Sequence, residues 1–169
     1  MPRIYLSFLI CCVMSFAVLQ FFGQAAPQNQ EATKELDIYL LIGGSNMAGR
    51  AEIPENAKGV IKRCYLLNDQ KQWEPAVSPL NRYSTIAKEN DLKKMGPGVA
   101  FARSMAKQNQ AGSIGLVVNA GSELKIDDWL GKSKAYRGIR GRSKAARLNG
   151  KIKGVIWLHG EEAPEDHLA

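Results

Sequence analysis

Three apolar runs along the chain each end in a polar turn that contains glycine. The first run, residues 38–42, is followed by Gly-Gly-Ser-Asn. The other two, residues 113–118 and 154–158, are followed by Asn-Ala-Gly-Ser-Glu and His-Gly-Glu. Short apolar runs of this kind are typical of strands that are covered on both faces of a sheet. The pattern therefore predicts buried strands that present polar groups where they end.

Two segments between these runs have the spacing of amphipathic helices. Gly-Pro-Gly at 96–98 begins the first, with proline in the first turn, and apolar residues then recur about every 3.6 positions. Residues 135–150 predict a second helix, weakened by Gly138 and Gly141, each costing about 1 kcal/mol relative to alanine. With residues 63–67 as a further strand, the alternation predicts an α/β fold. We expect a three-layer αβα sandwich with a mostly parallel, flavodoxin-like sheet.

A parallel sheet would bring the three polar turns together. In such sheets, ligands bind in the crevice beyond the carboxyl ends of the strands. The three turns should meet at that edge, so Ser45 is more than an ordinary turn residue. The sequence predicts a functional site there.

The first 25 residues have the features of a secretory signal peptide. A short basic start precedes an apolar stretch over residues 4–22 and then Gly-Gln-Ala, a small-x-small cleavage site. We expect residues 1–25 to be removed on export to the periplasm or the exterior, 26–36 to form a linker and 37–169 one domain. The stretch approaches the length of about 20 residues that spans a bilayer, so an uncleaved membrane tether is the alternative.

Removal of the signal leaves Cys64 as the single cysteine. It can form no internal disulfide, and no Cys/His cluster has the spacing of metal ligands, so we expect no metal and no cofactor. Cys64 should be a small buried apolar residue. The long connection over residues 69–91 has little periodicity and is a candidate binding surface. Trp73 and Tyr83 could stack on a sugar there, although Trp73 could equally pack against the sheet.

Four segments together resemble a known family. They are IYLLIGGSNMAGR, GPGVAFARSM, IGLVVNAGSELKIDDW and GVIWLHGEE. They occur in the order, and at roughly the spacing, of the sialate O-acetylesterase-like domain, the carbohydrate esterase family six branch of the SGNH-type hydrolases. The resemblance runs from about Asp37 to Glu162. It implies hydrolysis of an acetyl ester on a sugar, by a serine nucleophile and through an acyl-enzyme.

Matched motif by motif, the resemblance assigns residues to the site. Ser45 matches the family's nucleophile, and its own N–H, at the start of a helix, should donate to the developing oxyanion. The second motif, Asn-Ala-x-Gly-Gly, matches residues 119–123, and the third, Trp-His-Gln-Gly-Glu, has its glutamate at Glu161. The residues expected to line the oxyanion site are Gly44, Asn46, Asn119, Ser122, Glu123 and Glu161.

Several positions depart from the family pattern. Gly44 replaces a glutamine, and Ser122 and Glu123 stand where the family has two glycines. Glu123 is thereby expected to put a carboxylate close to the oxyanion. Leu-His stands in place of His-Gln in the third motif.

The general base is the largest departure. The family's final Asp-x-x-His motif does not occur up to residue 169, so we expect the last strand–helix unit to be lacking and an apolar edge to be uncovered. A serine hydroxyl is a weak nucleophile without a base within reach. His159 is the candidate base, whereas His167 is expected to lie in a frayed tail. A catalytically inactive relative or fragment that retains a sugar-binding role is the alternative function.

Residues 132–153 contain nine lysines and arginines and no acid. The segment predicts either a solvated helix face or a surface for an anionic partner such as acidic polysaccharide or lipid headgroups. It fits no nucleic-acid-binding module, and export argues against DNA, so no nucleic acid partner is expected.

Overall fold

Four of the five strands in the sheet run parallel. The computed structural model describes residues 35–160. The strands are β1 (Leu36–Gly43), β2 (Cys64–Leu67), β3 (Trp73–Pro75), β4 (Ser113–Ala120) and β5 (Gly150–Leu158), in the sheet order β3-β2-β4-β1-β5. β1 pairs in parallel with β4 and β5, β2 pairs in parallel with β4, and β3 is antiparallel to β2. The predicted α/β fold with a mostly parallel sheet is confirmed.

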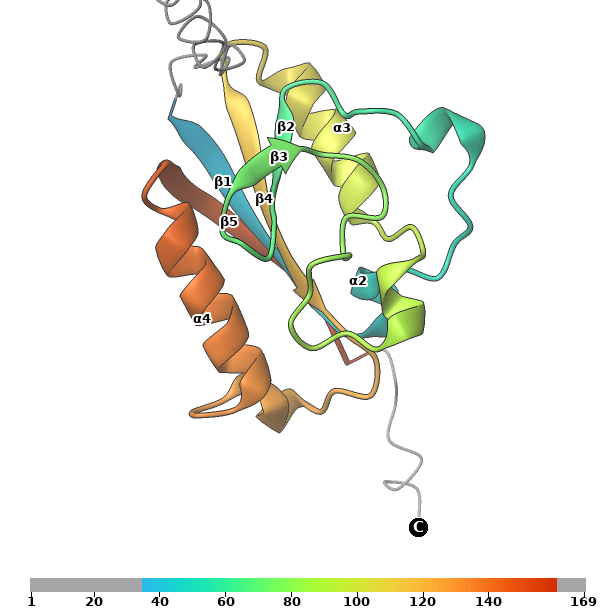
Figure 1. The fold of residues 1–169 in the computed structure, drawn as a ribbon, viewed down its shortest axis with the longest axis vertical. Helices are drawn as coiled ribbons and strands as arrows, with labels where there is room; N and C mark the ends of the chain where they lie inside the picture. The colour runs from blue at the N-terminus through green and yellow to red at the C-terminus, as the bar shows by residue number, and fades with distance from the viewer. Residues whose placement is uncertain (1–34, 161–169) are drawn as a thin grey trace, which may run out of the picture. The chain divides into compact units, whose positions relative to one another are not determined.

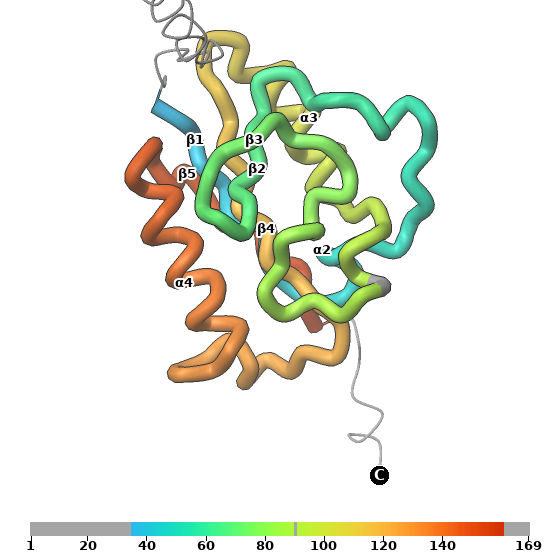
Figure 2. The backbone as a smooth tube through the Cα atoms, in the orientation of Figure 1, coloured from blue at the N-terminus to red at the C-terminus, as the bar shows by residue number. Residues whose placement is uncertain are grey.

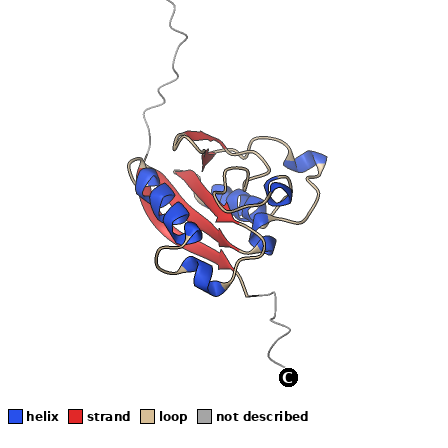
Figure 3. Ribbon diagram, turned by 60° about the horizontal axis from the view of Figure 1, so that its bottom comes forward, coloured by secondary structure: helices blue, strands red, loops and turns tan. Residues whose placement is uncertain are grey.

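Two helices cover opposite faces of this sheet (Figures 1 and 3). α3 (Gly98–Gln108) buries Val99, Ala102 and Ala106 against one face, and α4 (Lys134–Ala146) buries Ala135, Ile139 and Ala146 against the other. The remaining helical segments are short: α2 (Ser45–Ala48), η1 (Glu55–Ala57), η2 (Glu89–Leu92) and η3 (Ile126–Trp129). Within residues 35–160, no helix has the length and apolar character needed to cross a membrane.

β1 lies between β4 and β5, the two other long strands. Its side chains belong to both hydrophobic cores, one on each face of the sheet. Leu41 belongs to the core on the α3 side, and Ile38, Leu40 and Ile42 belong to the core on the α4 side. Burial on both faces explains why β1 is apolar at nearly every position rather than at alternate ones.

Some predicted boundaries were wrong. Arg63 has a φ of 59°, so β2 begins one residue later, at Cys64. The segment 69–91 is not wholly a loop, because it contains β3. α4 ends at Ala146 rather than at Gly150, and Gly150 already pairs with Leu36 as the start of β5.

Cys64 is buried and free, as predicted. Burial raises the pKa of its thiol to about 11, an effect that the nearby Arg63 charge only partly offsets. The thiol therefore stays protonated at neutral pH, and its Sγ lies 3.5 Å from the carbonyl oxygen of Ala102.

Neither aromatic residue of the predicted sugar platform is available as a free face. Trp73 packs in the α4-side core, and its Nε1 donates to Asn149. The Tyr83 hydroxyl donates to Glu74, and the Arg82 guanidinium lies 5.0 Å from its ring centre. Trp73 therefore packs against the sheet, which was the alternative interpretation.

β5 lies at the edge of the described sheet. In residues 35–160 no strand pairs with its outer side, and Val155, Trp157 and Leu158 remain 36–53% exposed. The expected uncovered apolar edge is thus present in the described part of the chain.

The two glycines of α4 have different surroundings and allow a matched stability prediction. A methyl group on Gly141 would meet no atom within 4 Å, whereas one on Gly138 would lie 2.2 Å from the Oγ1 atom of Thr85. Gly141→Ala should raise the free energy of unfolding by about 1 kcal/mol, the difference in helix propensity. Gly138→Ala should lower it by about 1–2 kcal/mol, because Thr85 must give up its bond to Asn119. Urea unfolding measures both, and shifts of the same sign would contradict the assigned packing.

Candidate functional site

The structure brings the three polar turns to one edge of the sheet. Gly43 of β1 is in register with Ala120 of β4 on one side and with Leu158 of β5 on the other. Two backbone hydrogen bonds continue this pairing into the turns: Gly44 N–H donates to the Leu158 carbonyl (2.9 Å), and Gly121 N–H donates to the Gly43 carbonyl (3.2 Å). The predicted convergence is confirmed.

The two glycines before Ser45 are not equivalent. Gly43 has a φ of 148°, and a Cβ there would lie 1.8 Å from the Leu158 carbonyl oxygen. Gly44 has a φ of −82°, which any residue adopts. Gly43 is therefore the glycine that the turn requires. Gly44, where the family has glutamine, keeps an ordinary backbone conformation.

Ser45 begins α2, which is a single turn that ends at Ala48, with Gly49 as its C-cap. The helix expected to begin at Ser45 is present but has only four residues, so its macrodipole contributes little and individual N–H groups must act as donors. Ser45 is only 6% exposed, whereas Asn46 faces solvent.

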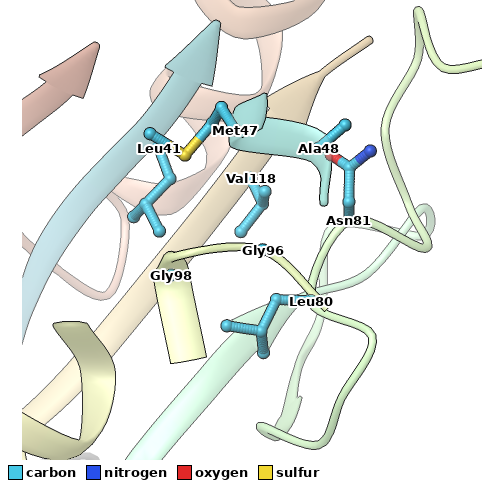
Figure 4. Close-up of a pocket in the computed structure, with 8 residues that line it drawn as sticks. All are labelled: Leu41, Met47, Ala48, Leu80, Asn81, Gly96, Gly98 and Val118. Atoms are coloured by element: carbon cyan, nitrogen blue, oxygen red, sulfur yellow. The ribbon is translucent and has the colours of Figure 1, made fainter. Parts of the chain in front are cut away.

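α2 packs against the hydrophobic core on the α3 side of the sheet. Met47 and Ala48 are buried there, next to an interior void of about 10 Å³, the space of about one water molecule (Figure 4). Gly96 passes so close that a Cβ would lie 2.5 Å from the Met47 carbonyl oxygen. This close backbone contact fixes the position of the turn that carries Ser45.

The hydrogen bonds of Asn119 stabilise the fold rather than point to a substrate. It is fully buried on the α4 side of the sheet, and its Oδ1 accepts hydrogen bonds from the Thr85 N–H (2.8 Å) and from the hydroxyls of Thr85 and Ser84. Its Nδ2 is buried and has no hydrogen-bond partner in the described part of the chain. Asn119 therefore holds the 84–85 segment against the end of β4.

Asp91 is the buried carboxylate of the site, and sequence reasoning missed it. Its side chain is 1% exposed and accepts from Arg50 (3.0 Å), from the Ser122 N–H (2.8 Å) and from the Ser122 hydroxyl (2.6 Å). The Lys88 N–H donates to it as well (3.2 Å). Through these bonds, Asp91 connects three segments: the one after α2, the turn after β4 and the loop that contains Asp91 itself.

Burial by itself raises the pKa of Asp91, because it disfavours the charged form. The hydrogen bonds from Ser122 and Lys88, together with the Arg50 charge, lower it by more in total. Asp91 is therefore ionised across the physiological pH range. The Ser122 N–H stands where the family has a glycine that approaches the oxyanion, and here it is engaged by this carboxylate.

Asn81 ties the same loop to β4. Its Oδ1 accepts from the Ala120 N–H, and its Nδ2 donates to the carbonyls of Ala120 and Asp91. The loop over residues 81–92 therefore depends on buried polar side chains rather than on regular secondary structure.

Glu123 does not place its carboxylate in the site as expected. Its side chain is 72% exposed and forms an ion pair with Lys88. Its backbone has a φ of 59°, the left-handed conformation that a glycine adopts without strain. The glutamate thus holds a backbone conformation that favours glycine, while its charge faces solvent.

Restoring glycine at this position should stabilise the protein. We expect Glu123→Gly to raise the free energy of unfolding by about 0.5–1 kcal/mol, because the left-handed strain is relieved and an exposed ion pair contributes little. Glu123→Ala is the control, since it removes the ion pair but keeps the strain. Thermal unfolding compares the two, and an equal shift in both variants would show that the backbone conformation is not the cause.

His159 follows β5 and packs edge-on against two tryptophans. Its ring centre lies 6.4 Å from that of Trp129 and 6.5 Å from that of Trp157. The Nε2 atom is buried and has no hydrogen-bond partner among residues 35–160. The three rings form an aromatic cluster on the α4 side of the sheet edge.

A groove begins at Asn46, next to Ser45. It has a volume of about 470 Å³ and runs between the segment over residues 50–57 and the start of α3. The tube trace shows this segment passing along the outer side of α3 (Figure 2). Arg50 and Arg103 supply its charge, and the apolar part of its lining is Ala51, Pro54, Ala57, Met95, Pro97, Val99 and Ala100.

Several predicted features cannot be placed. Glu161, His167, the signal segment with its candidate tether and residues 26–34 of the expected linker lie outside the described residues. The last linker residue, Leu36, is already the first residue of β1. Within residues 35–160, no group of three or more histidine, cysteine, aspartate or glutamate side chains is arranged to hold a metal ion.

Comparison with known proteins gives consistent results. Residues 35–168 match the profile of a family described as "SASA: Carbohydrate esterase, sialic acid-specific acetylesterase". The chain is 29% identical over 158 residues to an Arabidopsis thaliana protein named "Probable carbohydrate esterase At4g34215", covering 82% of this chain and 59% of the relative. The X-ray structure of the Arabidopsis thaliana protein AT4G34215 superposes with a TM-score of 0.65 at 27% identity, covering 75% of this chain and 58% of that one. The chain thus spans about three fifths of the length of the relative it matches.

Proposed function

The chain belongs to the carbohydrate esterase family of sialic acid-specific acetylesterases, and from this membership we propose that Ser45 is the nucleophile of an esterase acting on O-acetylated carbohydrate. The observation that carries the proposal is the position of Ser45. It directly follows β1, on a turn that requires glycine at position 43 and that is hydrogen-bonded to the ends of the two neighbouring strands, β4 and β5.

In the proposed reaction, the Ser45 oxygen attacks the carbonyl carbon of the acetyl ester and its proton passes to a base. The Ser45 N–H stabilises the developing oxyanion. Collapse of the tetrahedral intermediate breaks the bond to the sugar oxygen, which leaves as a hydroxyl group after taking up a proton. Water then attacks the acetyl group on Ser45, releasing acetate and restoring the serine.

The groove that starts at Asn46 is the proposed site for the sugar. Its apolar lining can contact the faces of a sugar ring, and its polar groups can hydrogen-bond to hydroxyls. Arg103 already donates to the Asn56 carbonyl (2.6 Å), which holds its guanidinium in the groove wall.

A sugar-binding role without hydrolysis is the second candidate. It is favoured by the engagement of the Ser122 N–H and hydroxyl with Asp91, which removes one expected oxyanion donor. The state of His159 also favours it, because its Nε2 is buried without a hydrogen-bond partner among residues 35–160, whereas a general base must lie within hydrogen-bond reach of the nucleophile.

Turnover of p-nitrophenyl acetate by the purified protein tests the esterase proposal. Ser45→Ala should lower kcat/KM by about 10³-fold or more, because it removes the group that becomes acetylated. Ser122→Ala is the control for disturbed packing at the same sheet edge, because it removes one hydrogen bond to Asp91 but leaves the Ser45 hydroxyl, and it should lose much less activity than Ser45→Ala.

Two results would decide against this esterase assignment. No turnover above that of Ser45→Ala would favour the inactive, sugar-binding relative. Equal losses in the two serine variants would show that the fold of the edge, and not the nucleophile, had been disturbed.

We also propose export of the protein with removal of residues 1–25. The apolar stretch over residues 4–22 and the small-x-small site after it support this proposal. N-terminal sequencing of the protein from the cell exterior or periplasm should begin near residue 26, and an intact start recovered with membranes would favour the uncleaved tether.

A further inference from the structure

The lysines and arginines of residues 132–153 separate into two groups in the structure. Arg142 is buried and donates to the carbonyls of Leu67 (2.6 Å) and Asn68 (3.3 Å). Lys151 pairs with Glu35 and Lys153 with Asp37. Arg142 therefore has a structural role, and Lys151 and Lys153 already have acidic partners, so none of the three is counted in a binding surface.

Five of the remaining cations lie on one face of α4 and its C-cap residue, and we call this surface the α4 basic stripe. Steps of three or four residues separate its members, so they project from the face opposite the buried one. All five are exposed, and within residues 35–160 none of them forms an ion pair. The members are Lys134, Arg137, Arg140, Lys144 and Arg147.

Helix stability accounts for Lys144 and Arg147 at the C-terminal end of α4, where positive charge complements the helix dipole, but not for the rest of the stripe. Like charges three or four residues apart destabilise a helix by about 0.2–0.5 kcal/mol per pair. Lys134 and Arg137 also lie at the start of α4, whose first turn contains no acid, where positive charge opposes the helix dipole. In the sequence, no acidic residue lies between Asp128 and Glu161. The unfavourable charge arrangement would be relieved by a bound polyanion.

The length, surface shape and residue types of the stripe indicate which kind of polyanion fits it. It is straight and about 20 Å long, from the rise of 1.5 Å per residue, and it lies on a convex helix surface rather than in a groove. Three of its five members are arginines, which can bind carboxylates through two parallel hydrogen bonds. A linear chain that carries repeated carboxylates matches both features.

We propose that the α4 basic stripe is a docking surface for an acidic, carboxylate-bearing polysaccharide, separate from the site at Ser45. The choice of a polysaccharide rests on the proposed carbohydrate substrate. α4 covers the face of the sheet opposite to α3, and the Ser45 groove lies along α3. The stripe would therefore hold a polymer to the protein while another part of it reaches the groove.

Binding of the full-length protein to polygalacturonate tests the proposal, with fully methyl-esterified polygalacturonate as the uncharged polymer of the same backbone. We expect binding to the acidic form only, weakening as salt rises. The combined variant Arg137→Gln/Arg140→Gln/Lys144→Gln should raise the Kd at least about tenfold. Glutamine has nearly the helix propensity of arginine and lysine, so α4 should remain folded.

The control variant is Lys58→Gln/Lys93→Gln/Lys94→Gln, which removes the same net charge elsewhere on the surface. The control variant should leave the Kd nearly unchanged. If both variants raise the Kd equally, binding depends on net charge alone, and the proposal is overturned. Tighter binding to duplex DNA or to anionic phospholipid vesicles, lost in the stripe variant, would also overturn it. Ser45→Ala should bind polygalacturonate as the wild type does, so the outcome is independent of whether the chain hydrolyses esters.

Discussion

Replacing Gly43 with alanine is expected to destabilise the protein by at least about 4 kcal/mol, which is most of the stability of an ordinary domain. The new Cβ would lie 1.8 Å from the Leu158 carbonyl oxygen, and the φ of 148° is unfavourable for any residue with a side chain. Relief requires separation of β1 from β5 at the edge where Ser45 is placed. We therefore expect little folded protein and no function from the site.

Gly59→Ala is the matched control for this prediction. A Cβ at Gly59 would meet no atom within 4 Å, and its φ is not in the positive range. Urea unfolding of the two variants should show a large loss for Gly43→Ala and almost none for Gly59→Ala. A folded Gly43→Ala protein with near wild-type stability would mean that the β1–β5 pairing at Leu158 is wrong.

Asp91→Asn is expected to lower the free energy of unfolding by about 2–4 kcal/mol at neutral pH. In asparagine, an NH2 group replaces one of the two carboxylate oxygens that accept hydrogen bonds from Ser122, Lys88 and Arg50. This NH2 group is a donor, and it would face other donors. The loop over residues 81–92 and the turn after β4 should loosen together. Faster amide hydrogen exchange in both segments would report this.

The effect of Asp91→Asn should depend on pH. The pKa of Asp91 is lowered in the folded protein, so the ionised carboxylate stabilises the fold above its unfolded pKa of about 3.9. That stability is lost as the pH falls through the folded pKa. The difference between wild type and Asp91→Asn should therefore be largest at neutral pH and shrink below about pH 4.

Glu89→Gln, two residues away, separates this effect from a general change in charge. Glu89 is exposed and pairs with Lys93 alone in the described structure, so its substitution should alter stability little at any pH. A difference for Asp91→Asn that stays constant from pH 7 to pH 3 would contradict the assigned role of the carboxylate.

The sheet and the meeting of its turns could be predicted because the pattern is local. Each long strand is a short apolar run ended by a glycine-containing turn, and parallel connection places such ends at one edge. The ends of the strands and helices were harder to predict. Gly150 belongs to β5, where it pairs with Leu36 of β1, although residues 147–151 continue the preceding polar segment in the sequence. Pairing partners that are distant in the sequence decided where β5 begins.

The polar interior of the site could not be predicted. Asp91 lies in a segment without periodicity, and its partners Arg50 and Ser122 are 41 and 31 residues away. An aspartate in such a segment is usually solvated, and nothing adjacent in the sequence marks this one as buried. For Glu123 the sequence showed a lost glycine, but its φ and the direction of its side chain follow from the turn that contains it.

By itself, the sequence determined the order of the four parallel strands and the two long helices, the position of Ser45 directly after the first strand and the family to which the chain belongs, because these depend on patterns of adjacent residues. The tertiary structure alone decided which donors and charges meet around that serine. It placed Asp91 against Ser122, His159 against two tryptophans, and five cations of residues 134–147 on an exposed face where none forms an ion pair within residues 35–160. The physical reason is that burial and hydrogen-bond partners are properties of contacts between distant segments, which form when the chain has packed.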